Sequence, residues 1–398
     1  MLFKNLFQEN LGETMCIYIH WPFCLSKCPY CDFNSHVSSS YDYQVWYDYY
    51  SKEIDFFYPL LYKKKVKSIF FGGGTPSLMS PDLVNKILDK IANICVVNND
   101  LEISLEANPN SSEAKKFKLF KKAGINRISI GVQSLNQKIL NFLGRKHTVK
   151  EGICAVENAK KYFDNFSIDI IYACKDHNLN NWIKELDNIL QLGPKHISLY
   201  QLTLEENTKF FNLAKKGLFD ELNSDISFDL LDYTNHKLKS EKYIQYEISN
   251  YSKESKFFCV HNINYWEYKN YLGIGPGAHS RIMSRNLEKV YAIENHKSPK
   301  IWFSNIDEKF HGAYKNFTLT KKEILTELLF VGLRLNKGIF FDKIKMISEK
   351  SFLNILKSKI FVKLKEEQLI QLDNSSLFLT AKGLLMHTEI VKELSCLL

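Results

Sequence analysis

The sequence predicts an α/β fold, a partial (β/α)6 barrel of the TIM type followed by a small C-terminal domain that is mainly helical and winged-helix-like. Six short runs rich in β-branched residues alternate with longer amphipathic segments. The runs are interpreted as apolar throughout, which is typical of parallel strands covered by helices. Successive strand–helix units of this kind give a parallel, right-handed arrangement. The runs are Cys16–His20, Val66–Phe71, Glu102–Glu106, Arg127–Gly131, Ser167–Tyr172 and His196–Gln201.

Local signals mark the helices between these runs. Ser80 followed by Pro81 is a helix N-cap with proline in the first turn, and Gly193-Pro194 ends a helix before the sixth run. Near the C-terminus, Leu319–Leu335 and Lys357–Leu372 predict helices, and the segment after them predicts a β-hairpin wing.

Changes of pattern divide the chain into four parts. Residues 1–14 are expected to be an N-terminal extension, and 15–210 the barrel. Residues 211–315 are aromatic and glycine-rich and are expected to complete the barrel, although the stretch from about 285 reads as a polar loop. Residues 316–398 form the predicted C-terminal helical domain.

Composition indicates an ordered protein in a reducing compartment. The chain has 398 residues, of which 45% are hydrophobic and 24% charged, so it can bury a large core. Its nine cysteines are an odd number and mostly scattered, which argues against a disulfide framework. We see no signal peptide and no apolar run of roughly 18 residues, so a cytoplasmic protein that does not span a membrane is expected.

The net charge of +9 does not by itself indicate a nucleic-acid partner. The basic residues are spread along the chain, and the densest run is Lys63–Lys65. A nucleic-acid patch would gather them on one face. No nucleic acid is therefore expected as a partner.

Cys24, Cys28 and Cys31 have the spacing C-x3-C-x2-C directly after the first strand run. A zinc site would need a second Cys or His pair at a suitable spacing, which the sequence lacks, and a redox pair would not need Cys24. Thiolates suit iron–sulfur clusters, for which four cysteines are usual. Three cysteines therefore predict a cluster with one iron open to a second molecule.

Unusual residues follow the other strand runs. Gly72–Pro76 follows the second run, Glu106 ends the third, Gln133 follows the fourth, and Tyr200–Gln201 closes the sixth. In a βα barrel these positions meet at the carboxyl rim, where active sites lie. The glycines alone would indicate a tight turn, but beside the cysteines they favour ligand binding.

Two further polar residues are expected near this rim. Arg145 could hold a carboxylate, and Asp169 lies in the fifth run. Each would singly be read as a cap or a satisfied surface group. Together with Glu106 and Gln133 they favour a polar cofactor with a ribose, an amine and a carboxylate.

The run His261-Asn-Ile-Asn-Tyr-Trp allows two interpretations. A single histidine is usually structural, yet imidazole is also the commonest axial ligand of haem. Both interpretations stay open. His20, His36 and His279 are expected to be structural.

From about residue 15 the chain resembles the radical S-adenosylmethionine (SAM) superfamily, in the branch of the oxygen-independent coproporphyrinogen III oxidases, and within it most the haem chaperones of the HemW group. The matching segments are 18–24, 28–35, 72–77, 130–134, 245–250, 261–266 and 271–280.

The resemblance implies a set of cofactor contacts. Cys24, Cys28 and Cys31 would bind a 4Fe–4S cluster, whose open iron takes SAM. The positions that match contacts to this first molecule are Tyr18, Gly73, Glu106 and, nearby, Ala278. Those that match a second SAM site of the related decarboxylase are Tyr30, Gly74, Thr75, Gln133, Arg145, Asp169 and Leu202.

Departures from the family pattern separate the two branches. The decarboxylases carry a cysteine where this chain has Phe33, and they have a long N-terminal arm that it lacks. Both differences favour the haem chaperones, in which haem binding is assigned to the motif at residues 261–266. Residues 173–178 depart from the usual loop, and Val260 replaces a basic residue.

Three functions are therefore considered. The first is a haem chaperone that binds a 4Fe–4S cluster, SAM and haem, receives electrons from a donor, and passes haem to acceptors such as membrane respiratory proteins. The second is a coproporphyrinogen III dehydrogenase, and the third an RNA-modifying radical enzyme. The chain is not expected to be a true dehydrogenase, whether it cleaves SAM stays open, and no catalytic residue is assigned.

Overall fold

Six parallel strands form the centre of the molecule in the computed structural model, which describes residues 2–398. They pair side by side in chain order, with Tyr18 opposite Phe70 in the first pair. The strands are β1 (Thr14–Trp21), β4 (Lys65–Gly73), β5 (Glu102–Ala107), β6 (Arg127–Gln133), β7 (Asn165–Tyr172) and β8 (His196–Gln201). All six predicted runs are therefore confirmed as strands of one parallel sheet.

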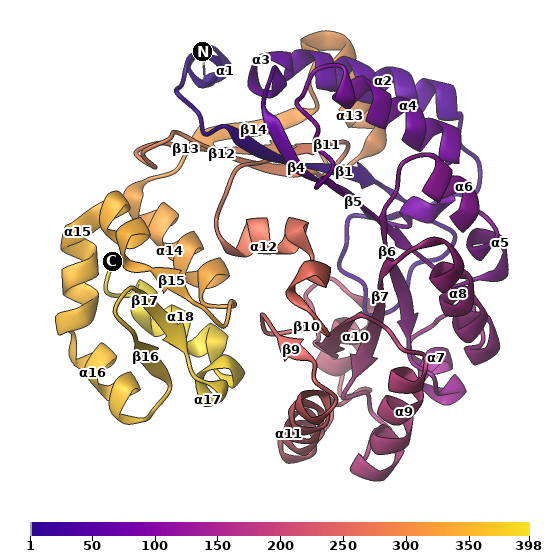
Figure 1. Cartoon of the computed structure of the whole chain (residues 1–398), viewed down its shortest axis with the longest axis vertical. Helices are drawn as coiled ribbons and strands as arrows, with labels where there is room; N and C mark the ends of the chain where they lie inside the picture. Colours follow the sequence, from indigo (N-terminus) through magenta and orange to yellow (C-terminus); the bar gives the residue numbers. More distant parts are fainter. Residues whose placement is uncertain (1) are drawn as a thin grey trace.

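Helices cover the outer, convex face of this sheet (Figure 1). The longer ones are α2 (Tyr43–Phe56), α4 (Pro81–Ala92), α8 (Val149–Tyr162), α9 (Leu179–Gln191) and α11 (Ser224–Ser240). Short helices are α1 (Leu2–Phe7), α3 (Tyr58–Leu61), α5 (Ser111–Ala114), α6 (Phe117–Lys122), α7 (Gln137–Phe142) and α10 (Lys209–Lys215). The expected helix start is confirmed, since the Ser80 side chain accepts a hydrogen bond from the Leu83 amide and Pro81 occupies the first turn.

Apolar residues alternate with polar residues or glycine along β5 and β6, so the interpretation of the runs as apolar throughout was wrong for these strands. β4 and β7 keep adjacent apolar residues, at 69–71 and 170–172. In β6 the apolar residues Ile128, Ile130 and Val132 are completely buried under the helices. Successive side chains of a strand point to opposite faces, so the residues between them face the inside of the barrel. The inner-face polar residues of the six strands include Ser68, Glu102, Ser104, Glu106, Arg127, Ser129, Ser167, Asp169, His196 and Ser198.

Further strands extend both edges of the sheet without closing it. Beyond β1 come β11 (Tyr271–Ile274), β12 (His279–Met283), β13 (Val290–Asn295) and β14 (Ala313–Thr318). Beyond β8 come β10 (Asn250–Ser252) and β9 (Ile244–Gln245). β11 is parallel to β1, and the other added strands run antiparallel to their neighbours. The result is the expected partial barrel, enlarged to twelve strands.

The expectation of a loop from residue 285 to 315 was wrong. This stretch contains β13, helix α13 (Pro299–Lys309) and the start of β14. β14 lies at the edge of the sheet, and most of its residues are exposed or half-buried. Edge strands keep polar, solvent-facing side chains, and this composition resembles that of a loop.

The C-terminal domain is mainly helical with a small sheet, as predicted. Its elements are α14 (Lys321–Gly332), β15 (Ile339–Phe340), α15 (Phe341–Lys357), α16 (Lys359–Glu366), β16 (Ile370–Leu372), β17 (Ser376–Leu379), α17 (Ala381–Leu385) and α18 (His387–Ser395). β16 and β17 form the expected hairpin, and the helix predicted up to Leu372 ends at Glu366. The Arg281 guanidinium donates to both carboxylate oxygens of Glu327 and so joins α14 to β12.

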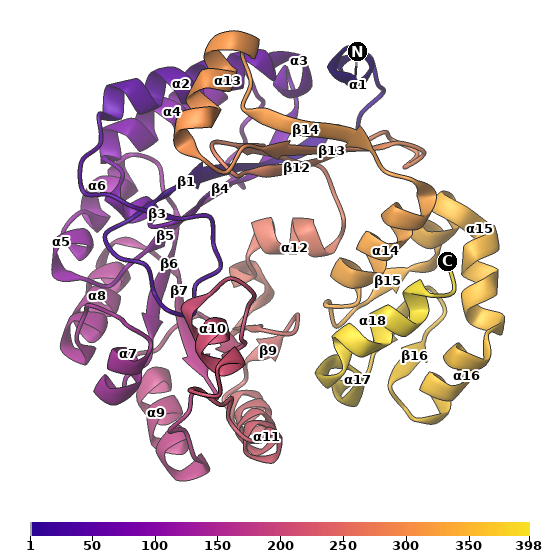
Figure 2. The same ribbon diagram turned by 180° about the vertical axis from the view of Figure 1, so that it is seen from behind.

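Helix α12 (Val260–Trp266) occupies the hollow between the inner face of the barrel and the C-terminal domain, as Figures 1 and 2 show from opposite sides. It contacts β4 on one side and α14 on the other. Within residues 2–398, no helix is long and apolar enough to cross a membrane.

One buried carboxylate ties the added strands to helix α2. Both oxygens of Glu53 accept hydrogen bonds, from the main-chain N–H groups of Gly275 and Gly312, from Asn295 Nδ2 and from Trp302 Nε1. The side chain is completely buried. The four donors come from the β11–β12 turn, β13, α13 and the segment before β14, so Glu53 holds four parts of the chain together.

Removing this carboxylate should destabilise the fold. We expect Glu53→Ala to lower the free energy of unfolding by about 3–5 kcal/mol, because buried donors lose their acceptor. Glu53→Gln should cost nearly as much, because its amide N–H group would face donors where an oxygen now accepts. Urea unfolding measures this, with Asp48→Asn on the exposed face of α2 as the control. A Glu53→Gln protein as stable as the wild type would contradict this role.

Candidate functional site

The three predicted cysteines lie in the loop between β1 and α2. Two short strands, β2 (Phe23–Cys24) and β3 (His36–Val37), pair and bracket this loop. Asn34 Nδ2 donates to the main-chain oxygens of Pro276 and Lys297, which fixes the loop to the β11–β12 turn and to the segment before α13. The loop thus covers the carboxyl end of the strands, where the sequence placed it.

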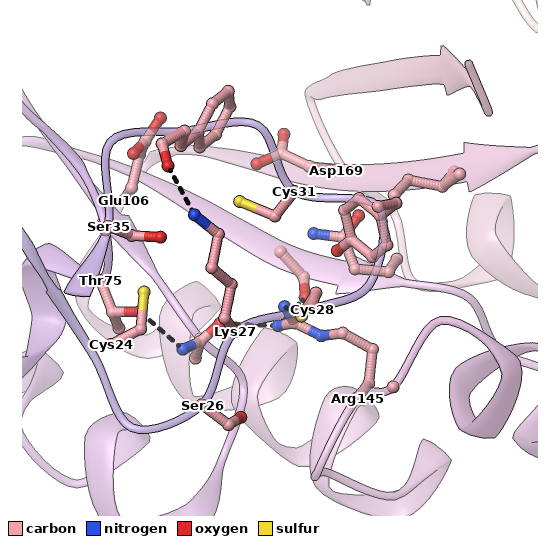
Figure 3. A pocket seen from close by; sticks show the side chains of 18 of the residues that line it. Cys24, Ser26, Lys27, Cys28, Cys31, Ser35, Thr75, Glu106, Arg145 and Asp169 are labelled. Carbon is pink, nitrogen blue, oxygen red and sulfur yellow. Dashed lines mark hydrogen bonds between the residues drawn. The ribbon is translucent and has the colours of Figure 1, made fainter. Parts of the chain in front are cut away.

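A cavity of about 510 Å³ opens at this rim. Figure 3 shows the three cysteines facing it together with Glu106, Asp169 and Arg145. The predicted residues that line it are Cys24, Cys28, Tyr30, Cys31, Gly74, Thr75, Glu106, Gln133, Arg145, Asp169 and Leu202. Residues from five strand ends and two loops therefore meet in one space.

The surroundings of the thiols fit an iron–sulfur cluster. Thr75 Oγ1 lies 3.2 Å from Cys24 Sγ and donates to it, and Arg145 Nη1 lies 3.6 Å from Cys28 Sγ. Such donors stabilise thiolates and tune clusters. Burial raises the pKa of Cys24 and of Cys31, so metal binding must displace their protons.

The cysteines are not arranged as ligands of one ion. Among the described residues, no three His, Cys, Asp or Glu side chains could hold a single metal ion. In a cubane cluster each thiolate binds a different iron, so the sulfurs surround the cluster instead of meeting at one point. The donor set, three thiols around one cavity, fits that requirement.

Arg145 lines the cavity and carries one donor without a partner in the described part of the chain. Its Nη2 donates to Asn108 Oδ1 at 2.6 Å and to the main-chain oxygen of Gly131 at 3.1 Å. Its Nε is buried and has no hydrogen-bond partner within residues 2–398. A buried N–H group without a partner is costly. The guanidinium as a whole places a positive charge beside the cavity, where an anionic group of a ligand would be attracted.

Glu106 and Asp169 form a half-buried pair of carboxyl groups on the inner wall of the cavity. Burial, with a further contribution from Asp169, raises the pKa of Glu106 to about 8, although the Gly73 N–H donates to it at 3.2 Å. Burial also raises the pKa of Asp169, which accepts from Ser129 Oγ at 2.8 Å and Ser167 Oγ at 2.9 Å. A carboxyl held neutral by burial gains a partner when a cationic ligand enters.

The glycines after β4 serve packing as well as access. A Cβ at Gly73, whose φ is +113°, would lie 2.6 Å from the His20 ring, and one at Gly74 would lie 2.6 Å from the Phe23 carbonyl oxygen. Any larger residue would therefore push β4 away from β1 and the cysteine loop. The glycines fix the position of the cysteine loop against the barrel.

Tyr18, Gly73 and Ala278 are absent from the described lining of the cavity. Tyr18 lies deeper in the barrel, where its hydroxyl is 3.1 Å from His20 Nδ1, and His20 Nε2 is 2.9 Å from the Asn34 main-chain oxygen. Ala278 is buried against Gly273 between β11 and β12. These residues stand behind the wall in this conformation.

The structure describes all six residues of the atypical loop at 173–178, and none of them lines the cavity. The loop therefore does not reach the cavity. Its Cys174 N–H donates to His177 Nδ1 at 3.2 Å, and His177 lies beside Glu185 of α9. The departure from the family pattern therefore lies beside α9, away from the cavity wall.

Sequence reasoning did not single out Asn108 and Lys27. Asn108 Nδ2 donates to Thr75 Oγ1 at 3.2 Å while its oxygen accepts from Arg145, so it links two predicted residues. Its place two residues after Glu106, at the end of a strand, was the available signal. Lys27 lines the cavity between two of the cysteines.

His261 is held inside the barrel by both ring nitrogens. Nδ1 lies 2.7 Å from Ser68 Oγ, Nε2 lies 2.9 Å from the Tyr265 hydroxyl, and the ring stacks on Phe70. Only 1% of the residue is exposed, and burial lowers its pKa to about 3. The carboxylate of Glu102 accepts from the N–H groups of Val260 and His261 and fixes the start of α12. In this conformation His261 cannot coordinate an iron.

A partial βα barrel with three thiols at its carboxyl rim is the arrangement of a protein that holds an iron–sulfur cluster beside a polar cofactor. Comparisons with known proteins agree. Residues 18–189 match the radical SAM superfamily, and residues 319–386 match the HemN C-terminal domain.

Curated relatives narrow the assignment. The chain is 37% identical to a heme chaperone HemW of Buchnera aphidicola, over 86% of this chain and 92% of that protein. It is 37% identical to HemW of Escherichia coli, over 67% of this chain and 70% of that protein. It is 32% identical to a mitochondrial radical S-adenosyl methionine domain-containing protein 1 of Danio rerio, over 94% of this chain and 85% of that protein. The chain therefore belongs to the radical SAM superfamily, in its HemN-like branch and close to the HemW proteins.

A solved structure supports the fold. The radical SAM enzyme coproporphyrinogen III oxidase (HemN) of Escherichia coli matches with a TM-score of 0.83 and 20% identity, over all of this chain and 93% of that one. Membership of the superfamily implies a 4Fe–4S cluster and SAM as cofactors.

The cysteine loop can be tested by metal content. Serine in place of Cys24, Cys28 or Cys31 should reduce the iron and sulfide bound after anaerobic reconstitution to a small fraction of the wild-type level, because one corner of the cluster is lost. Cys154→Ser, at an exposed cysteine of α8, is the control. Full iron content in any of the three loop variants would contradict the assignment.

Glu106 should make stability depend on pH. Its folded pKa of about 8 lies above the ordinary value of 4.5, so its favourable contribution is complete below pH 4.5 and is lost as pH rises through 8. In the cluster-free protein, Glu106→Gln should therefore raise the unfolding free energy at pH 9 by roughly 2–4 kcal/mol, and much less at pH 5. Chemical unfolding at both pH values measures this, with Glu157→Gln as an exposed control. Equal effects at both pH values would contradict the burial argument.

Proposed function

We propose that this protein is a haem chaperone of the radical SAM superfamily, which binds a 4Fe–4S cluster, SAM and haem and passes haem to acceptor proteins. The observation that carries the proposal is the similarity to HemW along almost the whole of that relative, combined with a three-thiol cavity at the barrel rim. An electron donor and haem acceptors, among them membrane respiratory proteins, belong to the same proposal, as does a cytoplasmic location.

In this proposal the three thiolates hold the cluster, and its open iron takes SAM. When bound, this pair would supply radical chemistry by reductive cleavage of the sulfonium. The chain itself would position the cofactor: Glu106 would accept from the amino group, and the Arg145 guanidinium would attract an anionic group. The wall of the cavity is supported from behind by Tyr18, Gly73 and Ala278. It is completed by Tyr30, Gly74, Thr75, Gln133, Asp169 and Leu202.

Gln133 is a further reason to expect a polar ligand here. Its backbone has a φ of +67°, in the left-handed region that non-glycine residues seldom adopt, and its side chain lines the cavity. This conformation costs roughly 1 kcal/mol. Strain of this kind gathers at binding sites, where the surrounding structure maintains it.

Haem ligation by His261 requires α12 to rearrange. The imidazole must leave Ser68, Tyr265 and the stacked Phe70, at a cost of about 1 kcal/mol for each hydrogen bond. Iron coordination would have to outweigh that cost. In this conformation the imidazole lies inside the barrel, so ligation has to begin with its release.

A second candidate is an oxidative decarboxylase of coproporphyrinogen, and the similarity of fold to HemN favours it. Phe33, which is 57% exposed in the cysteine loop, stands where the decarboxylases have another cysteine. Protoporphyrinogen formed anaerobically by the reconstituted, reduced protein would favour this function over haem transfer.

Haem titration tests the proposed ligand. Wild-type protein should bind about one haem per chain with a Soret band typical of histidine ligation, and His261→Ala should lose that band. Tyr265→Phe should bind haem severalfold more tightly, because Nε2 no longer has a partner to give up. Ser68→Ala, which disturbs the same contact but keeps the imidazole, should retain the band.

Two results would contradict this assignment. One is an unchanged Soret band in His261→Ala. The other is equal haem binding by Tyr265→Phe and the wild type, which would mean that release of Nε2 is not part of ligation.

A further inference from the structure

A second hollow, which we call the α12 groove, lies between the end of α12 and the C-terminal domain. It measures about 240 Å³. Figures 1 and 2 show α12 facing α14 and β15 across this junction. The groove is lined by Trp266, Glu267, Lys269, Leu328, Gly332, Lys337, Gly338, Ile339, Phe340 and Lys343. It is separate from the cysteine cavity, with which it shares no lining residue.

The charge of the groove is unbalanced. Among its described lining residues, the three ammonium groups of Lys269, Lys337 and Lys343 face one carboxylate, that of Glu267. Lys269 and Lys337 both pair with this carboxylate. The Lys343 ammonium donates to the main-chain oxygens of Glu267 and Tyr268 at the end of α12. The lining therefore holds two positive charges more than negative ones, next to apolar side chains.

Burial and the neighbouring Lys269 lower the pKa of Lys343 to about 8. Two ammonium groups close to each other, beyond what one carboxylate can neutralise, repel each other. An incoming anion relieves that repulsion.

The walls of the groove are apolar and aromatic. Trp266 forms one side, with the Arg334 guanidinium 4.4 Å from its ring centroid, while Arg334 itself pairs with Glu247. The indole Nε1 of Trp266 is buried without a partner in the part of the chain that the structure describes. Phe340, at the rim, is 50% exposed. A ligand with a flat apolar body and acidic groups would suit this groove.

We propose that the α12 groove binds the carboxylate-bearing edge of a tetrapyrrole, with Lys269 and Lys337 as the partners of its two carboxylates. The inference rests on the proposed haem function and adds to it the residues that recognise the acidic side of the ligand. The ammonium groups of Lys269 and Lys337 match two propionates, which would replace Glu267 as their common partner, and Trp266 and Phe340 match the apolar macrocycle.

The placement suits a ligand that also needs His261. Trp266 is the last residue of α12 and His261 the second, so the groove and the proposed iron ligand lie at the two ends of one short helix. Carboxylates bound at the groove would contact the end of α12. The start of the same helix has to move before the His261 imidazole can leave its hydrogen-bond partners. Lys343 holds the end of α12 and is a positioning residue, so it is left unchanged in the test.

The test compares ferric haem with its dimethyl ester, which keeps the iron and the macrocycle but lacks both negative charges. Both ligands are titrated into the full-length protein from the same detergent. The wild type should bind haem about tenfold more tightly than the ester, as expected for roughly one net charge-assisted contact. In a Lys269→Ala/Lys337→Ala variant this preference should fall to twofold or less.

Two further variants complete the design. Lys350→Ala/Lys357→Ala removes the same charge from exposed positions of α15 and should keep the tenfold preference. Glu267→Gln should bind haem severalfold more tightly than the wild type, because the competing carboxylate is gone, and it should not change ester binding.

The outcomes distinguish the two proposals. Wild-type protein that binds neither ligand would overturn the haem function and this inference together. Binding of both ligands with equal affinity, or a preference that survives in the Lys269→Ala/Lys337→Ala variant, would overturn the groove assignment alone. A gain of affinity in Glu267→Gln together with the loss in the double variant would support it.

Discussion

The structure depends on the need to cover a polar surface inside an open barrel. The inner face of the sheet carries buried serines, carboxylates, an arginine and a histidine, and each unsatisfied polar group there would cost about 1–3 kcal/mol. A closed barrel would fill this space with its own side chains, but this sheet leaves a gap between β14 and β9. Helix α12 fills part of that gap: it offers two N–H groups to Glu102 and an imidazole to Ser68. In this conformation the motif at residues 261–266 therefore has a structural role, because it covers and satisfies polar groups on the inner face of the barrel.

Helix α12 also connects the inside of the barrel to the C-terminal domain. Glu102 anchors α12 at the first residue of β5, and Glu106 lines the cysteine cavity four residues later, so about 13 Å of strand separates them. Between them lies Tyr18, with its ring near those of Phe70 and His261 and its hydroxyl on His20. At its other end, α12 pairs with the C-terminal domain through Glu267 and Lys337. A ligand that moves α12 would thus change its contacts both with the barrel and with the C-terminal domain.

Much of this could be predicted from the sequence. The six strands, the convergence of polar residues at their ends and the position of the cysteine loop all follow from local patterns. The alternation within the strands was missed because serines and glycines between branched residues look apolar in composition, whereas in β6 they separate an inner from an outer face. The strands from 285 to 315 were missed because an exposed edge resembles a loop.

Long-range contacts were beyond the reach of sequence patterns. Three hydrogen bonds of the structure join residues far apart in the chain, and nothing in the local sequence specifies them. They link His261 to Ser68, Asn108 to Arg145, and Glu53 to Gly312. For the same reason the sequence left the role of His261 open between a structural residue and a haem ligand. Its placement gives it a structural role in this conformation, so a ligand role would have to begin with its release.

That release can be measured directly by hydrogen–deuterium exchange of residues 260–266, with and without haem. The N–H groups of Val260 and His261 are bound to a buried carboxylate, so they should exchange slowly in the haem-free protein. When haem binds, this segment should exchange much faster while the strands β4 and β5 stay protected. Protection of α12 that is unchanged or increased by bound haem would contradict the claim that the helix must leave its seat for His261 to act.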